Sequence, residues 1–509
     1  MASRRDELNA YTFAKRRTLA AFIQPSPSGS EEGAPRPLRA IVPGLIVAVL
    51  VLAVFGAWGM FQPKAPAQWD EPGTRVIVGK QSTTRYVVLK TGKKSRLHPV
   101  LNLASARLMM KGADYKVIQV SDDILDAGVP PRGPILGIPY APDRLPSSDE
   151  AGAAKRWAVC EQPGGAGGRT TQEATFVLAD REAKVMDGAQ RLTDGEVMYV
   201  KTRAGARHLV DGKGTAYPVT GVEGDDLTDA LVGTTRKPQL VTKEWLATLH
   251  QGDPIRVPRL PAAVGSPAGV QGQLSADENR VGMVLKTRTG EGIKNYVVLP
   301  GRVQPLSEFT AWLLITSPQT AKLNMNGTAR TVGLQDFASD GQTFDGQAAK
   351  WPELRPDQVN TTTAAANRNT VCNVLRKVDS NGDTTLSTWA GPKYPADIVA
   401  GGTSTYVTPG TGLLYTQVQG NQAKSGSLFL VTDTGLRYAV QSNGDSDTGK
   451  SDIGTDDGMQ TDGSPEPSEA QVKLGYGDVR PAIVPLPWSE FLAKGPRLDA
   501  NSARQPQGS

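Results

Sequence analysis

The stretch IVPGLIVAVLVLAVFGAWGMF, at residues 41–61, decides how the rest of the chain is arranged. It contains no charged side chain, and at about 1.5 Å per residue it is long enough to cross a hydrocarbon layer about 30 Å thick as an α-helix. A buried helix of a soluble domain is the alternative, but such helices rarely stay apolar on every face over this length. The sequence therefore predicts one transmembrane helix, over residues 40–61.

Basic residues precede this helix and indicate its orientation. They are Arg4, Arg5, Lys15, Arg16, Arg17, Arg36 and Arg39, whereas Asp70 and Glu71 follow it. An excess of Lys and Arg keeps the preceding segment in the cytoplasm. Cleavage as a secretory signal is the competing hypothesis, because residues 65–67 (Ala-Pro-Ala) resemble a cleavage site, but the apolar run is too long and begins too late for a signal peptide. We predict a single-pass cell-membrane protein with a cytoplasmic N-terminus and the bulk of the chain extracytoplasmic.

The segment RRDELNAYTFAKRRTLAAFIQP, which starts at Arg4, is predicted to be a cytoplasmic helix. Its apolar stripe consists of Leu8, Tyr11, Leu19, Phe22 and Ile23. Such a helix can lie on the anionic inner leaflet or bind a cytoplasmic partner, and a solvated tail that only sets the topology is the alternative. The residues expected to make a cytoplasmic contact are Arg4, Arg5, Tyr11, Phe13, Lys15, Arg16 and Arg17.

The chain beyond the membrane helix has almost no net charge. The first forty residues hold seven basic and four acidic groups, so that only +2 of the total charge of +5 remains for the rest. Nucleic-acid-binding proteins need basic groups on the folded part, so this function is disfavoured. The 55 Gly and 37 Pro indicate many short strands and turns rather than a helical bundle, and 509 residues exceed what one core usually holds.

Four segments share a pattern in which two strand-like apolar runs flank a turn that contains glycine. They are residues 85–100, 197–210, 281–299 and 426–440. This pattern predicts β-hairpins. A short helix and a glycine- and proline-rich exit follow three of them, from Ser121, Thr242 and Pro487, and residues 334–337 match more weakly. Ser121 and Thr242 are natural N-caps.

The sequence predicts an α+β, β-rich fold in which four small hairpin-helix repeats extend from a central β domain. Strand-like runs at residues 156–160, 174–178, 371–378 and 413–418 are assigned to that central domain. The expected parts are a cytoplasmic helix and linker (1–39), the transmembrane helix (40–61), a first repeat (62–148), a second (186–265), a third (266–345), a fourth (426–509) with a disordered acidic insertion (441–470), and a central domain in two pieces (149–185 and 346–425).

Cys160 and Cys372 are the two cysteines of the chain, one in each piece of the predicted central domain. Outside the cytoplasm, two cysteines on strand-like segments more often form a disulfide than remain thiols. A catalytic thiol is the alternative, but His98, His208 and His250 all lie in the predicted repeats. We therefore predict a Cys160–Cys372 disulfide.

The sequence GDSDTGKS matches the phosphate-loop pattern G-x-x-x-x-G-K-[ST] through Gly444, Gly449, Lys450 and Ser451. A phosphate loop leads from a strand into a helix, but the residues that follow are rich in Gly, Asp and Pro. Residues 441–470 also carry eight acids and one base, which repel nucleotide phosphates. We interpret the match as coincidental, and expect no catalytic residue, no metal and no cofactor; ATP is the cofactor that a genuine site would bind.

Two weaker signals remain. Residues 379–383 (DSNGD) resemble the start of a calcium loop, but Ala390 stands where the last ligand should be, so Asn381 and Gly382 are better interpreted as a hairpin turn. Trp245, Trp351 and Trp488 are expected to fill cores, although exposed tryptophans could bind glycans.

Taken together, RRDELNAYTFAKRR, the single span, the four hairpin-helix segments, the Cys160/Cys372 pair and VTPGTGLLYTQV (residues 407–418) resemble the EccB family, a membrane component of actinobacterial type VII (ESX) secretion systems. The resemblance covers essentially the whole chain. It implies an elongated, propeller-like outer region whose repeat modules surround a disulfide-linked central domain. It also implies partners, namely the FtsK-like motor ATPase EccC and the membrane subunits EccD and EccE, and self-association. The acidic insertion departs from the family pattern.

Two functions of different classes follow. The first is a structural subunit of the secretion complex, which links the two sides of the membrane and helps to assemble the exporter. The second is an extracytoplasmic nucleotide hydrolase, since the family has been labelled an ATPase, although no convincing nucleotide site is present in this sequence. A cell-wall-binding module is a third, weaker hypothesis.

Overall fold

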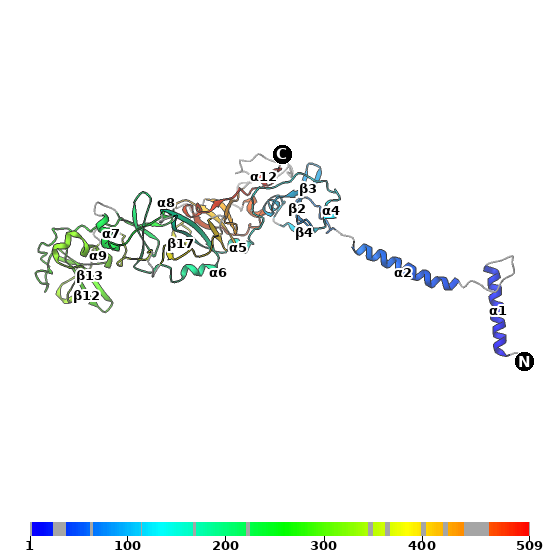
Figure 1. The fold of residues 1–509 in the computed structure, drawn as a ribbon, viewed down its shortest axis with the longest axis horizontal. Helices are drawn as coiled ribbons and strands as arrows, with labels where there is room; N and C mark the ends of the chain where they lie inside the picture. Colours follow the sequence, from blue (N-terminus) through cyan, green and yellow to red (C-terminus); the bar gives the residue numbers. More distant parts are fainter. Residues whose placement is uncertain are drawn as a thin grey trace. The chain divides into compact units, whose positions relative to one another are not determined.

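The structure is a computed structural model, and it describes residues 3–23, 37–61, 65–112, 114–165, 169–219, 224–344, 350–361, 367–398, 404–420, 426–441 and 468–507. The chain divides into two compact units. The helical unit comprises residues 1–67 and 120–127, and the β-rich unit comprises residues 68–119 and 128–509. Figure 1 labels the helices and strands of both units.

The helical unit contains α1 (Arg4–Ile23), α2 (Pro37–Phe61) and the single-turn α4 (Asp122–Leu125). Asp6 and Glu7 lie in the first turn of α1, where negative charge is favourable near the helix N-terminus. Within α2, Ile41–Gly59 has a mean hydropathy of 2.6, and none of this window is buried. The predicted apolar helix is therefore confirmed, although it begins at Pro37 and continues through Pro43.

The central sheet of the β-rich unit has the strand order β18-β17-β5-β6-β19. Its strands are β5 (Arg156–Gly164), β6 (Thr170–Leu178), β17 (Thr370–Val378), β18 (Thr384–Gly391) and β19 (Thr405–Val407). All neighbours are antiparallel except β6 and β19, which are parallel. Three of the four predicted central strands thus lie in this sheet, and both β5 and β6 are longer than expected.

The fourth predicted central strand was assigned to the wrong sheet. Residues 413–418 lie in β20 (Gly412–Val418), which pairs with β21 (Ser427–Thr432) in antiparallel register and with β23 (Ala482–Pro485) in parallel register. Because β20 is hydrogen-bonded to these neighbours, it is the first strand of the fourth sheet in the sequence. The fourth predicted repeat therefore begins at Gly412 and not at residue 426.

Four further sheets share a three-stranded antiparallel core. The first has the order β3-β2-β1-β4, the second β10-β7-β8-β9-β11 with β16 also on β7, the third β14-β13-β12-β15, and the fourth β23-β20-β21-β22-β24. In the second to fourth sheets, a short later strand (β10, β15 or β23) pairs in parallel with the first core strand. In the part of the chain that the structure describes, every sheet is open, and none closes into a ring.

The bounds of these strands are as follows: β1 (Arg75–Gly79), β2 (Arg85–Thr91), β3 (Lys94–Val100), β4 (Lys116–Val120), β7 (Glu196–Lys201), β8 (Arg207–Asp211), β9 (Thr215–Val219), β10 (Gln239–Leu240), β11 (His250–Gln251), β12 (Val284–Thr289), β13 (Gly292–Leu299), β14 (Arg302–Leu306), β15 (Arg330–Thr331), β16 (Asp357–Gln358), β22 (Leu436–Ala439) and β24 (Ala493–Lys494). The predicted hairpins are confirmed as β2–β3, β7–β8, β12–β13 and β21–β22. Gly435, at the tip of the last one, has φ of 78°, a conformation that glycine adopts without strain.

Short helices connect the strands of the β-rich unit. They are α3 (Leu103–Leu108), α5 (Ser148–Gly152), α6 (Asp180–Ala183), α7 (Gly224–Val232), α8 (Lys243–Leu246), α9 (Glu308–Thr316), α10 (Glu469–Lys473), α11 (Leu486–Ser489), α12 (Ala500–Ala503), and the 3₁₀ turns η2 (Lys184–Asp187), η3 (Pro318–Leu323) and η4 (Leu334–Asp336). The predicted short helices are present as α4, α8, η4 and α11. The side chain of Thr242 caps α8 by accepting a hydrogen bond from Trp245 N, whereas Ser121 occupies the N-cap of α4 and its hydroxyl donates to Asp123 Oδ2 instead of accepting a capping bond.

The buried cores show which sheets pack together. One core contains central-sheet residues such as Trp157, Trp245 from α8, and Trp488 from α11. A second core joins the first sheet to the fourth. Phe309 and Leu313 of α9 pack against the second sheet, and α7 and α9 lie side by side (Figure 1). The central sheet is therefore the element on which the second and fourth sheets meet.

The last described residues return to the first sheet. Pro506 bridges Leu136, and Gln507 N donates to the carbonyl oxygen of Ile135 at 2.9 Å. The helix α12 just before them contacts α3, and Leu498 and Ala503 belong to the core shared with the first sheet. The C-terminal segment thus completes the packing of the first sheet.

Candidate functional site: the disulfide-linked central sheet

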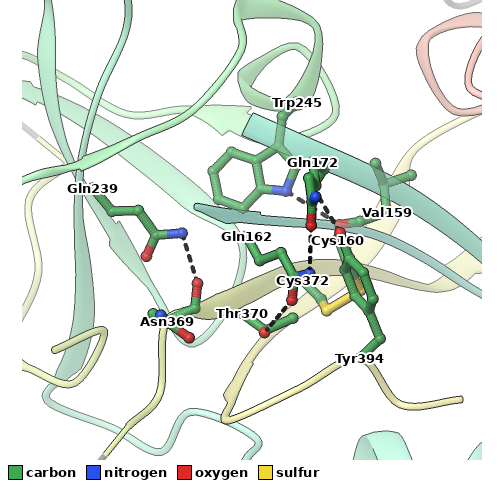
Figure 2. Close-up of a disulfide and its surroundings, with 10 residues drawn as sticks. All are labelled: Val159, Cys160, Gln162, Gln172, Gln239, Trp245, Asn369, Thr370, Cys372 and Tyr394. Carbon is green, nitrogen blue, oxygen red and sulfur yellow. Dashed lines mark hydrogen bonds between the residues drawn. A yellow bond between two sulfur atoms is a disulfide. The ribbon is translucent and has the colours of Figure 1, made fainter. Parts of the chain in front are cut away.

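Cys160 and Cys372 form a disulfide at the middle of the central sheet. They lie opposite each other on the antiparallel strands β5 and β17, with their Cα atoms 4.0 Å apart, and both side chains are fully buried (Figure 2). The bond joins residues 212 positions apart, so it closes a loop that contains the whole second and third sheets. The predicted disulfide is present, and the described chain has no free cysteine, so the catalytic-thiol alternative is wrong.

The disulfide faces an apolar layer on one side of the sheet. This layer includes Phe176, Met186 and Trp389, and Tyr394 covers part of it. The Tyr394 hydroxyl donates to the carbonyl oxygen of Gln172 at 2.7 Å (Figure 2). Burial raises the pKa of Tyr394, and the carboxylates of Glu161 and Glu173 raise it further, so the phenol remains neutral. The disulfide bond is therefore covered by apolar side chains and by the neutral phenol of Tyr394.

The opposite side of the sheet holds α8 in place. Trp245 is fully buried, and its indole Nε1 donates to the carbonyl oxygen of Val159 at 3.1 Å (Figure 2). Asn373 Nδ2 donates to the carbonyl oxygen of Trp245 at 2.9 Å and contacts Thr248 Oγ1 at 2.7 Å. Strands β5 and β17 thus both bind α8. Trp245 and Trp488 are core residues as predicted, and Trp351 is partly buried and packs against the core of the second sheet.

A carboxyl group lies beneath the start of α8. Glu161 follows Cys160 on β5, is fully buried, and accepts hydrogen bonds from the backbone N–H and the hydroxyl of Thr242, with N–Oε2 at 3.0 Å. Burial raises the pKa of Glu161 to about 7 despite these hydrogen bonds, and the carboxylates of Glu173 and Glu244 act in the same direction. Glu161 was not among the predicted site residues, because the strand was expected to end at Cys160. The alternation of side chains along a β-strand could have indicated its burial, because it places Glu161 on the same face of β5 as Trp157 and Val159.

Two hollows flank this region and both touch Thr171. One, of about 570 Å³, is lined by residues of β6 that include Glu173, by Tyr394 and by Phe491. The other, of about 670 Å³, lies between the turn of the β7–β8 hairpin and the residues Thr242, Lys243 and Glu244 at the start of α8. The second hollow therefore brings solvent next to the residue that binds Glu161.

The histidines lie away from the disulfide bond. His98 Nδ1 is 3.0 Å from the carbonyl oxygen of Pro134, and His250 Nε2 is 2.7 Å from Thr384 Oγ1. Burial lowers the pKa of both His98 and His208, which favours the neutral imidazole. His98 and His208 thus pack within the first and second sheets, whereas the exposed His250 links β11 to Thr384 of the central strand β18.

The structure places the remaining predicted site residues as follows. Gly444, Gly449, Lys450 and Ser451 lie outside the described residues, as does most of the insertion at 441–470, although α10 begins within it at Glu469. The segment at 379–383 forms the β17–β18 turn, and Asp379 Oδ1 accepts hydrogen bonds from the backbone N–H groups of Asn381 and Asp383. The predicted hairpin turn is therefore confirmed.

The side chains of Arg4, Arg5, Tyr11, Phe13, Lys15, Arg16 and Arg17 all lie on α1 and are exposed. The predicted helix is confirmed, but α1 presents both apolar and basic groups to its surroundings, and Phe22 is 92 % exposed. Nothing in the described helical unit covers these apolar side chains.

Comparisons with known proteins agree with this architecture. A family model described as "Type VII secretion system ESX-1, transport TM domain B" matches residues 1–508. The ESX-3 secretion system ATPase EccB3 of Mycolicibacterium smegmatis is 27% identical over 495 residues, which cover 91% of this chain and 83% of the relative. The ESX-1 secretion system ATPase EccB1 of Mycobacterium tuberculosis is 28% identical over 281 residues, or 54% of this chain and 53% of the relative.

Two solved structures share the fold. The EccB3 dimer from the ESX-3 core complex has a TM-score of 0.57 at 22% identity and covers 84% of this chain and 99% of that one. A chain of the intact ESX-5 inner membrane complex has a TM-score of 0.58 at 21% identity and covers 100% of this chain and 96% of that one. Because the family model matches almost every residue, this chain belongs to the EccB family, the transport TM domain B of type VII secretion systems.

Proposed function

We propose that the protein is a structural subunit of a type VII (ESX) secretion complex in the cell membrane. The observation that carries this proposal is the family match over residues 1–508, which includes α1, the apolar helix α2 and the whole β-rich unit. The basic residues before α2 support a cytoplasmic N-terminus and an extracytoplasmic β-rich unit. The disulfide supports the same orientation, because such bonds persist outside the reducing cytoplasm.

The partners proposed for this subunit are an EccC-like motor ATPase, EccD- and EccE-like membrane subunits, and further copies of the chain itself. A relative of similar fold is described as a dimer from the ESX-3 core complex, and another is part of an ESX-5 inner membrane complex. In this proposal, α2 packs among neighbouring membrane helices and α1 binds on the motor side.

We further propose that the first to fourth sheets are repeats of one module arranged around the central sheet, in the elongated, propeller-like manner expected for the family. Their shared connectivity supports this: in each case three antiparallel strands are followed by a helix (α3, α7, α9 or α10), then by a short strand that pairs with the first of the three, and then by a short helix, which is an α-helix in three sheets and the 3₁₀ helix η4 in the third. A repeated module of this size buries its apolar face against its neighbours, as the cores of the second and fourth sheets do on the central sheet.

Deleting residues 4–23 should abolish co-purification of the other membrane subunits. The physical reason is that α1 carries exposed apolar and basic side chains that only a partner or the membrane surface can cover. The measurement is detergent extraction followed by mass spectrometry of the proteins that co-purify with the tagged chain.

The matched variants are R16E/R17E, which should reduce co-purification strongly, and D6N/E7Q, which alters the acids of the same helix and should leave it unchanged. Non-reducing electrophoresis would verify that each variant keeps the Cys160–Cys372 bond. Normal assembly of the truncated chain would refute the contact role of α1.

Nucleotide hydrolysis remains the second candidate function, because curated relatives carry the name ATPase and Lys450 belongs to a phosphate-loop pattern. Under this hypothesis, K450A should remove at least nine-tenths of the turnover of ATP by the purified full-length protein, since the lysine would bind the β- and γ-phosphates. Lys494, an exposed residue of β24, provides a control variant, K494A. Equal phosphate release from all three proteins would eliminate the hydrolase hypothesis and leave the structural role.

A further inference from the structure

Glu161 of the central sheet binds Thr242, the N-cap residue of α8. The backbone N–H of Thr242 lies 3.0 Å from Oε2 and 3.4 Å from Oε1, and the Thr242 hydroxyl donates to Oε1. The same hydroxyl oxygen accepts from Trp245 N at 3.1 Å. A continuous chain of hydrogen bonds therefore runs from the first turn of α8 to a carboxyl group that is fully buried in β5.

The charged groups around Glu161 are mostly of its own sign. Glu173 lies opposite Glu161 on β6, and Glu244 belongs to α8. The phenol of Tyr394, which follows β18 in the sequence, also interacts electrostatically with Glu161. Lys243 is directed away, because its side chain is 86% exposed and lies 3.7 Å from Glu244, while Arg203 lies across the solvent-filled hollow. A negative charge on Glu161 is therefore buried next to other carboxylates, which is costly.

Other contacts would hold α8 when this one weakens. Trp245 is bound to Val159, and Asn373 is bound to both Trp245 and Thr248. These contacts fasten the middle and the end of α8, whereas Glu161 fastens its start. The start also borders the 670 Å³ hollow, which provides space beside residues 242–244.

We propose that the protonation state of Glu161 controls how firmly the start of α8 is held on the central sheet. When the carboxyl group of Glu161 is neutral, Thr242 at the start of α8 stays bound to it. With an ionised one, the buried charge favours opening of residues 242–244 toward the hollow, where water solvates the carboxylate. The second sheet, and the third sheet that packs on it through α9, are then less tightly joined to the disulfide-linked centre.

The direction of the pH effect follows from the two states. In the open state Glu161 is in water and titrates near its ordinary value of 4.5, whereas in the closed state its pKa is about 7. Between these values opening releases a proton, so opening becomes more favourable as the pH rises, and the effect levels off above about pH 7. One proton gives a change of up to roughly tenfold per pH unit, and roughly twentyfold between pH 5.5 and 7.5.

Hydrogen–deuterium exchange of the full-length protein in detergent tests this proposal. After correction for the intrinsic pH dependence of exchange, opening of residues 242–249 should increase roughly twentyfold from pH 5.5 to 7.5 in the wild type. It should be independent of pH in E161Q, which keeps the shape of the side chain without its charge. A pH-independent wild type, or an E161Q protein with the wild-type slope, would overturn the proposal.

Two further variants separate proton control from simple packing. T242V removes the hydroxyl donor but keeps the backbone N–H, so the pKa of Glu161 should rise and the pH at which opening levels off should move upward. A purely structural cap would instead lose protection equally at every pH. E244Q removes the charge of an exposed neighbour of Glu161, so opening should keep the same dependence on pH but level off at a slightly lower pH. The exchange of residues 284–299 of the third sheet serves as the internal reference.

Discussion

Replacing both Cys160 and Cys372 by alanine should lower the free energy of unfolding of the β-rich unit by up to about 5 kcal/mol, the loop-entropy limit for a disulfide that joins residues 212 apart. In the oxidised protein, residues 160–372, which include the second and third sheets when folded, remain a closed loop in the unfolded state. Without the bond, folding must bring β5 and β17 together from far along the chain. The expected result is a lower denaturation midpoint in urea for the full-length protein in detergent.

The reducing agent dithiothreitol supplies the control for this prediction. It should shift the midpoint of the denatured and refolded wild type toward that of the C160A/C372A variant, and it should not affect the variant itself. Each single variant, C160A or C372A, should resemble the double variant, because both remove the same bond. An unchanged midpoint in the double variant would mean that packing in the central sheet alone holds the loop closed.

Replacing Trp245 by alanine should destabilise the junction of the second and central sheets by about 3–5 kcal/mol, the usual range for truncating a fully buried aromatic side chain. The substitution leaves a cavity in the core that Trp157 and Trp488 share, and it leaves the carbonyl oxygen of Val159 without its indole donor. Exchange protection should fall across residues 242–249 and in β5, while the fold of the third sheet persists.

Two other aromatic substitutions bracket this effect. W245F retains most of the apolar volume but loses the N–H donor, so it should cost about 1–3 kcal/mol. Y140A removes a side chain that is 89% exposed and should change stability by less than about 0.5 kcal/mol. If W245A and Y140A had equal effects on urea denaturation, Trp245 would not be the anchor of α8.

The apolar helix, the four hairpins, the short helices and the disulfide could be predicted because each has a local signal in the sequence. The edge strands β10, β15 and β24 could not, since each has two residues and too short a run to show any periodicity. The run LLYTQV was recognised as a strand but assigned to the wrong sheet, because its choice of neighbours depends on pairing with distant residues such as Ala482.

The candidate site was predicted only in part. The disulfide followed from the number of cysteines and the expected compartment, but the buried Glu161 did not, because an acidic residue at the end of an apolar run normally indicates the protein surface. Its burial results from α8, whose N-cap Thr242 is 81 residues away in the sequence. A contact of this kind becomes visible only when the sheets are assembled.

The return of the C-terminal segment to the first sheet has a consequence for biosynthesis. The first sheet is the earliest part of the β-rich unit to be made, yet its core includes Leu414, Leu474 and Leu498, and its edge residue Leu136 is bridged by Pro506. Domains usually fold in the order in which they emerge during synthesis. Here the core of the first sheet stays incomplete until more than 300 later residues have been translated, so the sheet that follows α2 in the sequence is among the last parts of the β-rich unit to acquire its final structure.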